Sequence, residues 1–272
     1  MQIFRLTLTF MLAMGIAGVI DAQQPQKKKK VLAIGAVAGF QHDSVSNGLA
    51  TIYDLGHETG LWDTYIRTDT QLITKKKIAA GNAKNLDYFD AIYLYTTGEL
   101  PLDDSQKADL LSFVHDDGKG IIGGHSAIDT FYKWPEYGEM MGAWFDQHPW
   151  GQFDAPVIVE NHQAPMSKHL PATFTIKDEI YQASKEFSRD KIDVLARLDP
   201  DKIDLANPRV HRTDKDFAVA WVKNYGKGRV FYTTLGHREE VYDNPAIRKM
   251  YLEATKWALR LTDYEPKPHP KP

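Results

Sequence analysis

The sequence predicts an α/β protein with a doubly wound, mostly parallel sheet flanked by helices. Short apolar runs of strand length alternate with amphipathic stretches of helix length over the first 125 residues, at the spacing of β-α-β units. The chain has 272 residues, of which 43% are hydrophobic, and this supplies enough apolar material for a full core. A long aromatic segment interrupts the alternation. We therefore expect one α/β domain that carries an insertion.

The first four expected strands are apolar runs typical of buried parallel strands. The first ends at Gly35, and a polar loop and an amphipathic helix to about Gly60 follow it. A second helix opens near Asp103, a residue type that caps helices, and Gly118 closes it. The strands are expected at residues 31–35, 62–67, 89–95 and 120–123, and the helices at 44–60 and 101–115.

The second half of the chain begins with the insertion, residues 134–152, which is rich in aromatic residues and is expected to be a functional loop. A hairpin is expected around Gly226-Lys-Gly228. Further strands are expected at 156–160, 173–176 and 193–197, the hairpin strands at 217–225 and 228–234, and a last helix at 244–261. The α/β domain then spans residues 31–262, and a Pro-rich tail, residues 263–272, is expected to be unstructured.

The composition excludes several classes of function. The chain has no cysteine, so thiol nucleophiles, cysteine-ligated zinc, iron–sulfur clusters and disulfides are all excluded. It has 33 Lys and Arg against 36 Asp and Glu, which gives a net charge of −3. Charges of both signs are interspersed, so we expect no nucleic-acid partner.

The amino terminus has the pattern of a secretory signal peptide, residues 1–22, followed by a polar linker, residues 23–30. Arg5 precedes an apolar run over residues 6–20, and Ala22 is a plausible cleavage point. The run is short for a membrane span. Lys27 to Lys30 follow it, and this charge opposes export, so a retained amino-terminal anchor stays open. We expect export to the periplasm and no transmembrane span after processing.

The first candidate site is Ile121-Ile-Gly-Gly-His-Ser-Ala127, where an expected strand ends in small residues before a polar pair. Doubly wound folds place their ligand sites beyond the carboxyl ends of such strands. The segment is also similar to a nucleophile elbow, which would present either His125 or Ser126. The alternative is a tight turn in which one of these side chains merely caps a helix.

A second candidate is His237, which follows the last expected strand, with Glu239 two residues later. An imidazole near a carboxylate suits a general base or a metal ligand. Three more histidines lie in polar loops, where functional residues concentrate: His42, His148 and His211. We expect some of these five histidines to converge on one pocket.

The aromatic residues of the insertion have two interpretations. Rings beside a polar pocket suit stacking on sugars, with polar side chains bonding the hydroxyl groups. The alternative is a small satellite core under the loop. On the first interpretation, the substrate-binding residues are His42, Trp134, Tyr137, Trp144, His148, His211 and Asp214.

Eight segments spread along the chain carry a family resemblance: Phe40-Gln-His-Asp-Ser44, Gly123-Gly-His-Ser-Ala127, Trp134-Pro-Glu-Tyr137, Gly142-Ala-Trp-Phe-Asp-Gln-His-Pro149, Asp178-Glu-Ile-Tyr181, Val194-Leu-Ala-Arg-Leu-Asp199, His211-Arg-Thr-Asp-Lys-Asp-Phe217 and residues 226–237. Together they resemble the ThuA-like (trehalose utilisation) family, a branch of the class I glutamine amidotransferase-like fold. The resemblance covers about residues 31–261 and implies a flavodoxin-like topology.

The resemblance also has implications for the chemistry. Amidotransferases use a Cys at the elbow and a His-x-Glu after a late strand. Here His237-Arg-Glu239 matches the second part, but the Cys is absent, so Cys-dependent glutamine hydrolysis is excluded. Ser126 could act as nucleophile with His237 as base and Glu239 as its orienting group.

A metal site is the other chemical alternative, with His125 and His237 acting as ligands together with His42 or His148. The family's link to sugar metabolism implies a small carbohydrate ligand, a glycoside or a keto-sugar, on which an enzyme would perform hydrolysis, isomerisation or elimination. A sugar-binding module without catalysis is the alternative function. The sequence is compatible with a bound divalent metal and with a homo-oligomer, and it decides neither.

Overall fold

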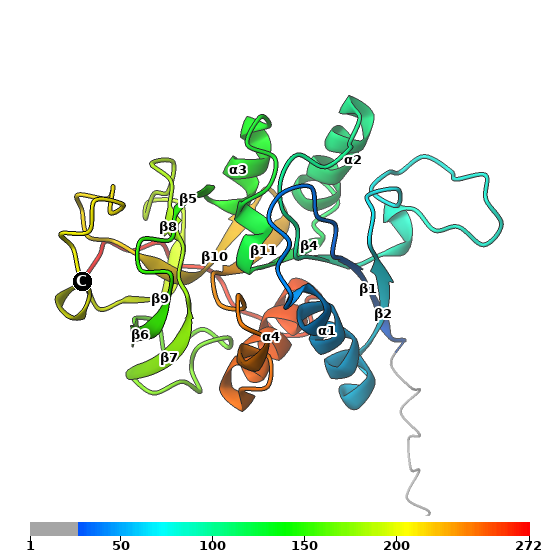
Figure 1. The fold of residues 1–272 in the computed structure, drawn as a ribbon. Helices are drawn as coiled ribbons and strands as arrows, with labels where there is room; N and C mark the ends of the chain where they lie inside the picture. The colour runs from blue at the N-terminus through cyan, green and yellow to red at the C-terminus, as the bar shows by residue number, and fades with distance from the viewer. Residues whose placement is uncertain (1–26) are drawn as a thin grey trace, which may run out of the picture.

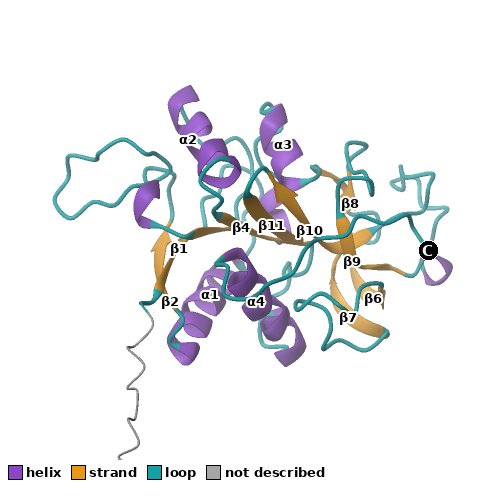
Figure 2. Ribbon diagram, turned by 180° about the vertical axis from the view of Figure 1, so that it is seen from behind, coloured by secondary structure: helices purple, strands orange, loops and turns teal. Residues whose placement is uncertain are grey.

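The computed structural model describes residues 27–272 of the chain. In this part, nine strands form one sheet in the order β2-β1-β3-β4-β11-β10-β9-β6-β7, and β5 pairs with β8 in a separate two-stranded sheet. Helices α2 and α3 cover one face of the large sheet, and α1 and α4 cover the other (Figures 1 and 2). The predicted fold class is therefore confirmed.

One half of the sheet is parallel and contains the four strands expected first. It comprises β2 (Trp62–Arg67), β1 (Lys29–Ile34), β3 (Ala91–Leu94), β4 (Gly120–Gly124) and β11 (Gly228–Thr233). This is the flavodoxin-like strand order, with β11 in the place of the fifth strand. Because helices cover both faces, β3 and β4 are buried along their whole length. The carboxyl ends of all five strands lie at one edge of the sheet.

The other half is antiparallel. It comprises β10 (Ala218–Tyr225), β9 (Asp193–Leu198), β6 (Gln152–Val159) and β7 (Thr173–Glu179). The predicted hairpin joins β10 to β11, and Gly226 takes the positive φ of 57° that the turn requires. β11 therefore belongs to both halves, because it pairs in parallel with β4 and in antiparallel with β10.

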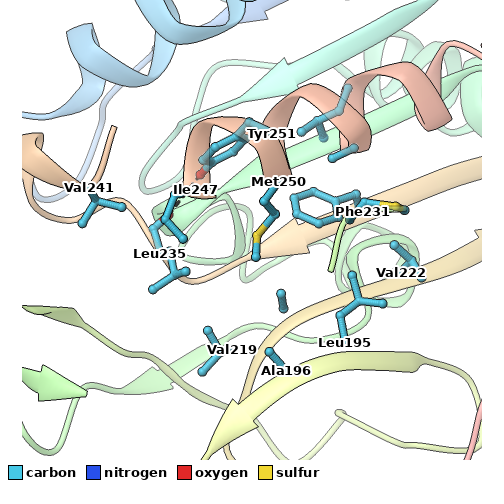
Figure 3. Close-up of a cluster of buried hydrophobic side chains, with 14 of the residues drawn as sticks. Leu195, Ala196, Val219, Val222, Phe231, Leu235, Val241, Ile247, Met250 and Tyr251 are labelled. Atoms are coloured by element: carbon cyan, nitrogen blue, oxygen red, sulfur yellow. Dashed lines mark hydrogen bonds between the residues drawn. The ribbon is translucent and has the colours of Figure 1, made fainter. Parts of the chain in front are cut away.

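Four α-helices of the described residues, 27–272, complete the layers: α1 (Val45–Thr59), α2 (Asp104–His115), α3 (Pro135–Met141) and α4 (Pro245–Ala258). Asp103 caps α2 in a reciprocal capping box with Gln106, and Asn244 caps α4 by accepting two backbone N–H groups. The inner face of α4 places Met250 and Tyr251 against the sheet residue Phe231 (Figure 3). Short 3₁₀ turns occur at Leu86–Tyr88, His125–Ile128, Pro200–Lys202 and Glu239–Val241.

The insertion is more regular than a loop, because it contains α3 and the short strand β5 (Phe145–Gln147), which pairs with β8 (Gln182–Ala183). The Pro-rich tail has no helix or strand, but it is packed against the domain rather than unstructured. The Tyr264 hydroxyl donates to Asp193, and the Lys267 backbone N–H donates to the same carboxylate. The predicted signal peptide lies outside the described residues. Within residues 27–272, no helix is long and apolar enough to cross a membrane.

Candidate metal centre

The turn after β4 presents His125. Its φ is +38°, in the left-handed region that a non-glycine residue rarely adopts, and its side chain is fully buried. Gly124 precedes it without room for a side chain, because a Cβ there would lie 2.6 Å from the Tyr93 hydroxyl. Such conformations persist where the surroundings impose them, and they concentrate at functional sites. His125 therefore takes the elbow position, and Ser126 lies behind it, fully buried.

Four side chains meet beyond this turn, and we call them the histidine–glutamate cluster: His42, His125, Glu179 and His237. Each offers one ligand atom, and these four atoms all lie within 4.8 Å of one another. They come from four separate segments: the β1–α1 loop, the turn after β4, the end of β7 and the loop after β11. Three of these positions lie at the carboxyl ends of parallel strands, where doubly wound folds bind ligands.

Glu179 is the centre of the cluster. Its Oε2 lies 3.1 Å from Nδ1 of His237 and 3.6 Å from Nε2 of His125, while its Oε1 lies 3.4 Å from Nδ1 of His148. Two of the three cluster imidazoles also approach each other, with 3.3 Å between His125 Nε2 and His237 Nδ1. One carboxylate thus contacts three histidines, and His148 extends the cluster toward solvent.

The hydrogen bond at Nδ1 of His125 determines the tautomer of this ring. Nδ1 lies 2.6 Å from the carbonyl oxygen of Thr234, which can only accept, so Nδ1 carries the proton. Nε2, the atom that would bind a cation, then faces Glu179 and His237. Histidines that bind metals are usually oriented in this way by a backbone carbonyl or a carboxylate.

Backbone contacts hold His237 in place. The buried carboxylate of Asp178 accepts the backbone N–H groups of Gly236 and Arg238, on either side of His237. The Tyr95 hydroxyl donates to the carbonyl of Gly236, whose φ of +129° favours glycine. Since Asp178 and Glu179 are consecutive at the end of β7, this strand end both positions His237 and supplies its carboxylate partner.

The protonation states reflect this crowding. Burial would raise the pKa of the Glu179 carboxyl, but the imidazoles of His125 and His237 outweigh it and hold that pKa well below its usual range. Burial lowers the pKa of His237, yet the contact with Glu179 prevails and raises it. Burial, followed by the charges of the two other histidines, lowers the pKa of His42 to about 3. In the absence of a cation, Glu179 is ionised and His42 is neutral.

This donor set fits a divalent metal ion. Nitrogen and carboxylate ligands bind first-row metals at about 2.0–2.2 Å, so two ligands of one ion lie at most about 4.4 Å apart. The four donor atoms here lie within 4.8 Å of one another, so only a slight contraction would be needed. His42 is 6% exposed, and its Nδ1 has no hydrogen-bond partner among the described residues. Imidazole with carboxylate suits zinc, iron or manganese.

An aromatic ring borders the cluster on the solvent side. Phe40 is 64% exposed, and its ring centroid lies 4.7 Å from that of His42 and 6.3 Å from that of His237. Tyr181 closes the inner side, with its ring 4.3 Å from that of His125 and its hydroxyl 3.3 Å from His42 Nε2. The cluster therefore has one buried aromatic wall and one exposed aromatic edge.

The other residues considered from the sequence lie apart from the cluster. Glu239 is exposed at the start of a 3₁₀ turn, and Glu179 is the carboxylate that contacts His237. Trp134 and Tyr137 are buried in the core, where the Tyr137 hydroxyl donates to the carbonyl of Ala127. Trp144 packs against α3.

His211 and Asp214 lie on the surface. His211 pairs with Asp146 at 2.9 Å, and Asp214 accepts hydrogen bonds from Arg212. Neither of these pairs belongs to the cluster.

Sequence reasoning missed Glu179 and Tyr181 as site residues. Both lie in Asp178-Glu-Ile-Tyr181, a segment that carried the family resemblance without an assigned role. Two consecutive carboxylates at the end of an expected strand were the available signal. That signal was weak, because β7 is the edge strand of the antiparallel half, and the approach of its end to His125 and His237 is not visible in the spacing.

Comparisons with known proteins give the family. The family model described as "ThuA: Trehalose utilisation" matches residues 30–258. A solved structure described as ThuA-like, from Bacteroides uniformis ATCC 8492, has a TM-score of 0.69 and 20% identity and covers 88% of this chain and 94% of its own.

Another ThuA-like structure, from Parabacteroides merdae ATCC 43184, has a TM-score of 0.66 and 17% identity, with coverages of 86% and 90%. A β-galactosidase from Rahnella sp. R3 has a TM-score of 0.50 and 12% identity over 85% of this chain and 32% of its own. At these identities the likenesses show the fold alone. No curated protein matches the chain. Because the family match spans most of its length, the chain belongs to the ThuA trehalose-utilisation family.

Proposed function

We propose that this ThuA-family protein is an enzyme that acts on a small carbohydrate at a divalent-metal centre formed by the histidine–glutamate cluster. The observation that carries the proposal is the convergence of three imidazoles and one carboxylate, from four segments, within 4.8 Å. Nδ1 of the buried His42 has no hydrogen-bond partner among the described residues, and an unpaired buried polar atom is costly. The substrate class, a glycoside or a keto-sugar, follows from the family's description and is part of the proposal.

The cluster residues would hold the cation, and a bound divalent cation polarises a carbonyl group or lowers the pKa of a water molecule. Glu179 stays ionised, and the Thr234 contact at Nδ1 of His125 aims Nε2 of this ring at the cluster. His148 is half-buried beside Glu179, so it is placed to take up or release a proton between the site and solvent. The exposed Phe40 ring offers a face on which a sugar can stack.

The serine-nucleophile alternative receives less support from the geometry. The hydroxyl of Ser126 is fully buried and has no hydrogen-bond partner in residues 27–272, and the imidazole of His125 faces the cluster in its place. A nucleophile needs a base within hydrogen-bond reach. We therefore favour metal-assisted hydrolysis, isomerisation or elimination over an acyl-type mechanism.

A sugar-binding module without catalysis remains the second candidate, because the exposed ring of Phe40 would hold a sugar whether or not a reaction follows. We also retain the proposal of export, which depends on residues 1–22, outside the described part.

The test is the metal content of the protein from Gln23 onward, purified without chelator or histidine tag. We expect near-stoichiometric zinc, iron or manganese in the unaltered protein, and its loss in His125→Ala, Glu179→Gln and His237→Ala. Glu239→Gln is the matched control and should retain the metal, because Glu239 lies outside the cluster. Absence of metal from the unaltered protein, even after supplementation, would overturn the metal centre.

Sugars and keto-sugars are then screened with the metal-loaded protein. Conversion that depends on His237 supports the enzyme. Saturable binding without any product, together with retained metal, would support the binding module instead.

A further inference from the structure

A second feature of the molecule lies on the α3 face of the sheet, where Lys223 is buried on β10. Lys223 is only 6% exposed, and its Nζ donates a hydrogen bond to the backbone carbonyl of Glu139 at 2.5 Å. Within residues 27–272, no carboxylate oxygen lies within 4.0 Å of this Nζ. The Tyr225 ring also lies near this group, with its centroid 5.7 Å from Nζ. An ammonium group has three donors and a full charge, so one carbonyl and one aromatic ring leave it incompletely compensated.

The contrast with a neighbouring buried cation makes this unusual. Arg189 is 9% exposed, and its guanidinium is bonded by two carboxylates, with Asp216 at 2.6 Å and Glu160 at 2.7 Å. Among residues 27–272, Arg189 is thus paired with two carboxylates, whereas Lys223 has no carboxylate in ion-pair contact. Buried charges in proteins are normally paired, so we expect an anionic ligand to bind at Lys223.

Lys223 lines a cavity that has room for such an acceptor. The cavity has a volume of about 630 Å³ and lies between α3, the segment after it and residues 186–192. Its lining shares no residue with the histidine–glutamate cluster. This makes it a site separate from the proposed metal centre.

One wall of the cavity is Trp144, which packs closely against α3. A Cβ at Gly138 would lie 2.4 Å from the indole, so glycine at this position is what allows the ring to lie there. The indole Nε1 is buried and has no hydrogen-bond partner among the described residues. Two residues of the lining, Trp144 and Lys223, therefore carry donors that are not fully used.

The charged residues around the cavity indicate what net charge a ligand should carry. Lys191 adds a second positive charge at the rim, and Glu139 and Glu186 add two negative ones. The balance favours a single negative charge at Lys223 and disfavours a dianion such as a phosphate monoester. Carboxylates at the rim can accept hydrogen bonds from hydroxyl groups of the same ligand.

We propose that this cavity binds a small hydroxylated monocarboxylate, a molecule of the sugar-acid class, with its carboxylate on Lys223 and its hydroxyl groups at the acidic rim. Burial lowers the pKa of Lys223 to about 8, and the charge of Glu139 offsets only part of this effect. The proposal does not depend on the function of the histidine–glutamate cluster.

The test is a titration of the ¹⁵N-labelled protein with D-gluconate, followed by the indole resonance of Trp144, which Trp144→Phe identifies. We expect saturable shifts with gluconate and much weaker effects with D-glucose, which lacks the carboxylate, and with glucose 6-phosphate, which is a dianion. Lys223→Met should weaken gluconate binding roughly ten- to hundredfold, the scale of a lost charged hydrogen bond. Lys249→Met, on an exposed face of α4, is the matched control and should bind as the unaltered protein does.

Several outcomes would overturn the proposal: no saturable shift with gluconate, equal binding of glucose, tighter binding of glucose 6-phosphate, or unchanged affinity in a folded Lys223→Met. If that variant does not fold, Lys191→Met takes its place, with a smaller expected loss because Lys191 lies at the rim. His237→Ala separates the two sites. Gluconate binding should survive this change, and loss of binding in His237→Ala alone would place the ligand at the cluster instead.

Discussion

The parallel and antiparallel halves of the sheet make different contributions to the candidate metal centre. The parallel half supplies the three histidines, from the loops after β1, β4 and β11, where this architecture generally places ligand-binding residues. The antiparallel half supplies the carboxylate, Glu179, and the neighbouring Asp178 that holds the loop of His237. The centre is thus a product of the junction, and neither half contains it alone.

Removing the carboxylate of the antiparallel half should have the largest effect on the centre. Glu179→Gln keeps the shape of the side chain but removes the charge that three histidines contact. We expect metal affinity to fall roughly 100-fold or more, since even indirect partners of metal ligands are worth about 10–100-fold. Competition titration with a chromophoric chelator measures this, and Glu239→Gln should change little. Equal affinities in both variants would mean that the antiparallel half contributes no ligand.

The next largest effect should come from weakening the contact between the end of β7 and the loop of His237. Asp178→Asn replaces a buried carboxylate that accepts the N–H groups of Gly236 and Arg238. We expect the free energy of unfolding to fall by about 1–3 kcal/mol, the cost of leaving a buried donor poorly satisfied. Urea denaturation measures it. Asp154→Asn, exposed on β6 of the same half, should stay within about 0.5 kcal/mol of the unaltered protein.

The pH dependence of metal binding should follow His237. Its pKa is raised by Glu179, despite burial, so below that pKa a proton competes with the cation. Affinity should therefore rise with pH from 5 through the region above 6.5, by at most about tenfold per unit, and then level off. Zinc titrations at several pH values measure this. An affinity that is flat over this range, or that rises on acidification, contradicts the assignment of His237 as a ligand.

The smallest effect is expected at His211, which pairs with Asp146 on the surface, away from the cluster. His211→Ala should leave metal content unchanged and alter stability by no more than about 0.5 kcal/mol, as is usual for surface changes. Metal analysis and thermal unfolding test it together. Loss of metal in this variant would extend the centre beyond the junction of the two halves.

The difference between the halves also explains what the sequence could predict. The parallel strands are buried on both faces, so their apolar runs predict β1, β3 and β4 directly, and the polar residues that follow them mark the site edge. His125 and His237 could be selected because the first directly follows β4 and the second lies in the loop just after β11. The convergence of His42 with them follows from the same architecture.

Glu179 could not be selected in this way. Its strand is an edge strand of the antiparallel half, and which strand ends meet across a junction depends on tertiary pairing rather than on local spacing. Local spacing instead favoured Glu239, which the chain turns into solvent at a 3₁₀ turn. Trp134 and Tyr137 show a similar ambiguity, because an aromatic residue in the sequence has the same pattern whether it stacks on a ligand or fills a core.

The most direct test of the metal centre is anomalous diffraction from crystals of the metal-bearing protein, collected at the absorption edge of the metal found by analysis. The account predicts one strong peak at the junction, within about 2.0–2.3 Å of donor atoms of His42, His125, Glu179 and His237. A peak coordinated by only the three histidines would remove the antiparallel half from the centre. No peak at the cluster in crystals grown with the metal, or a peak elsewhere in the chain, would contradict the account.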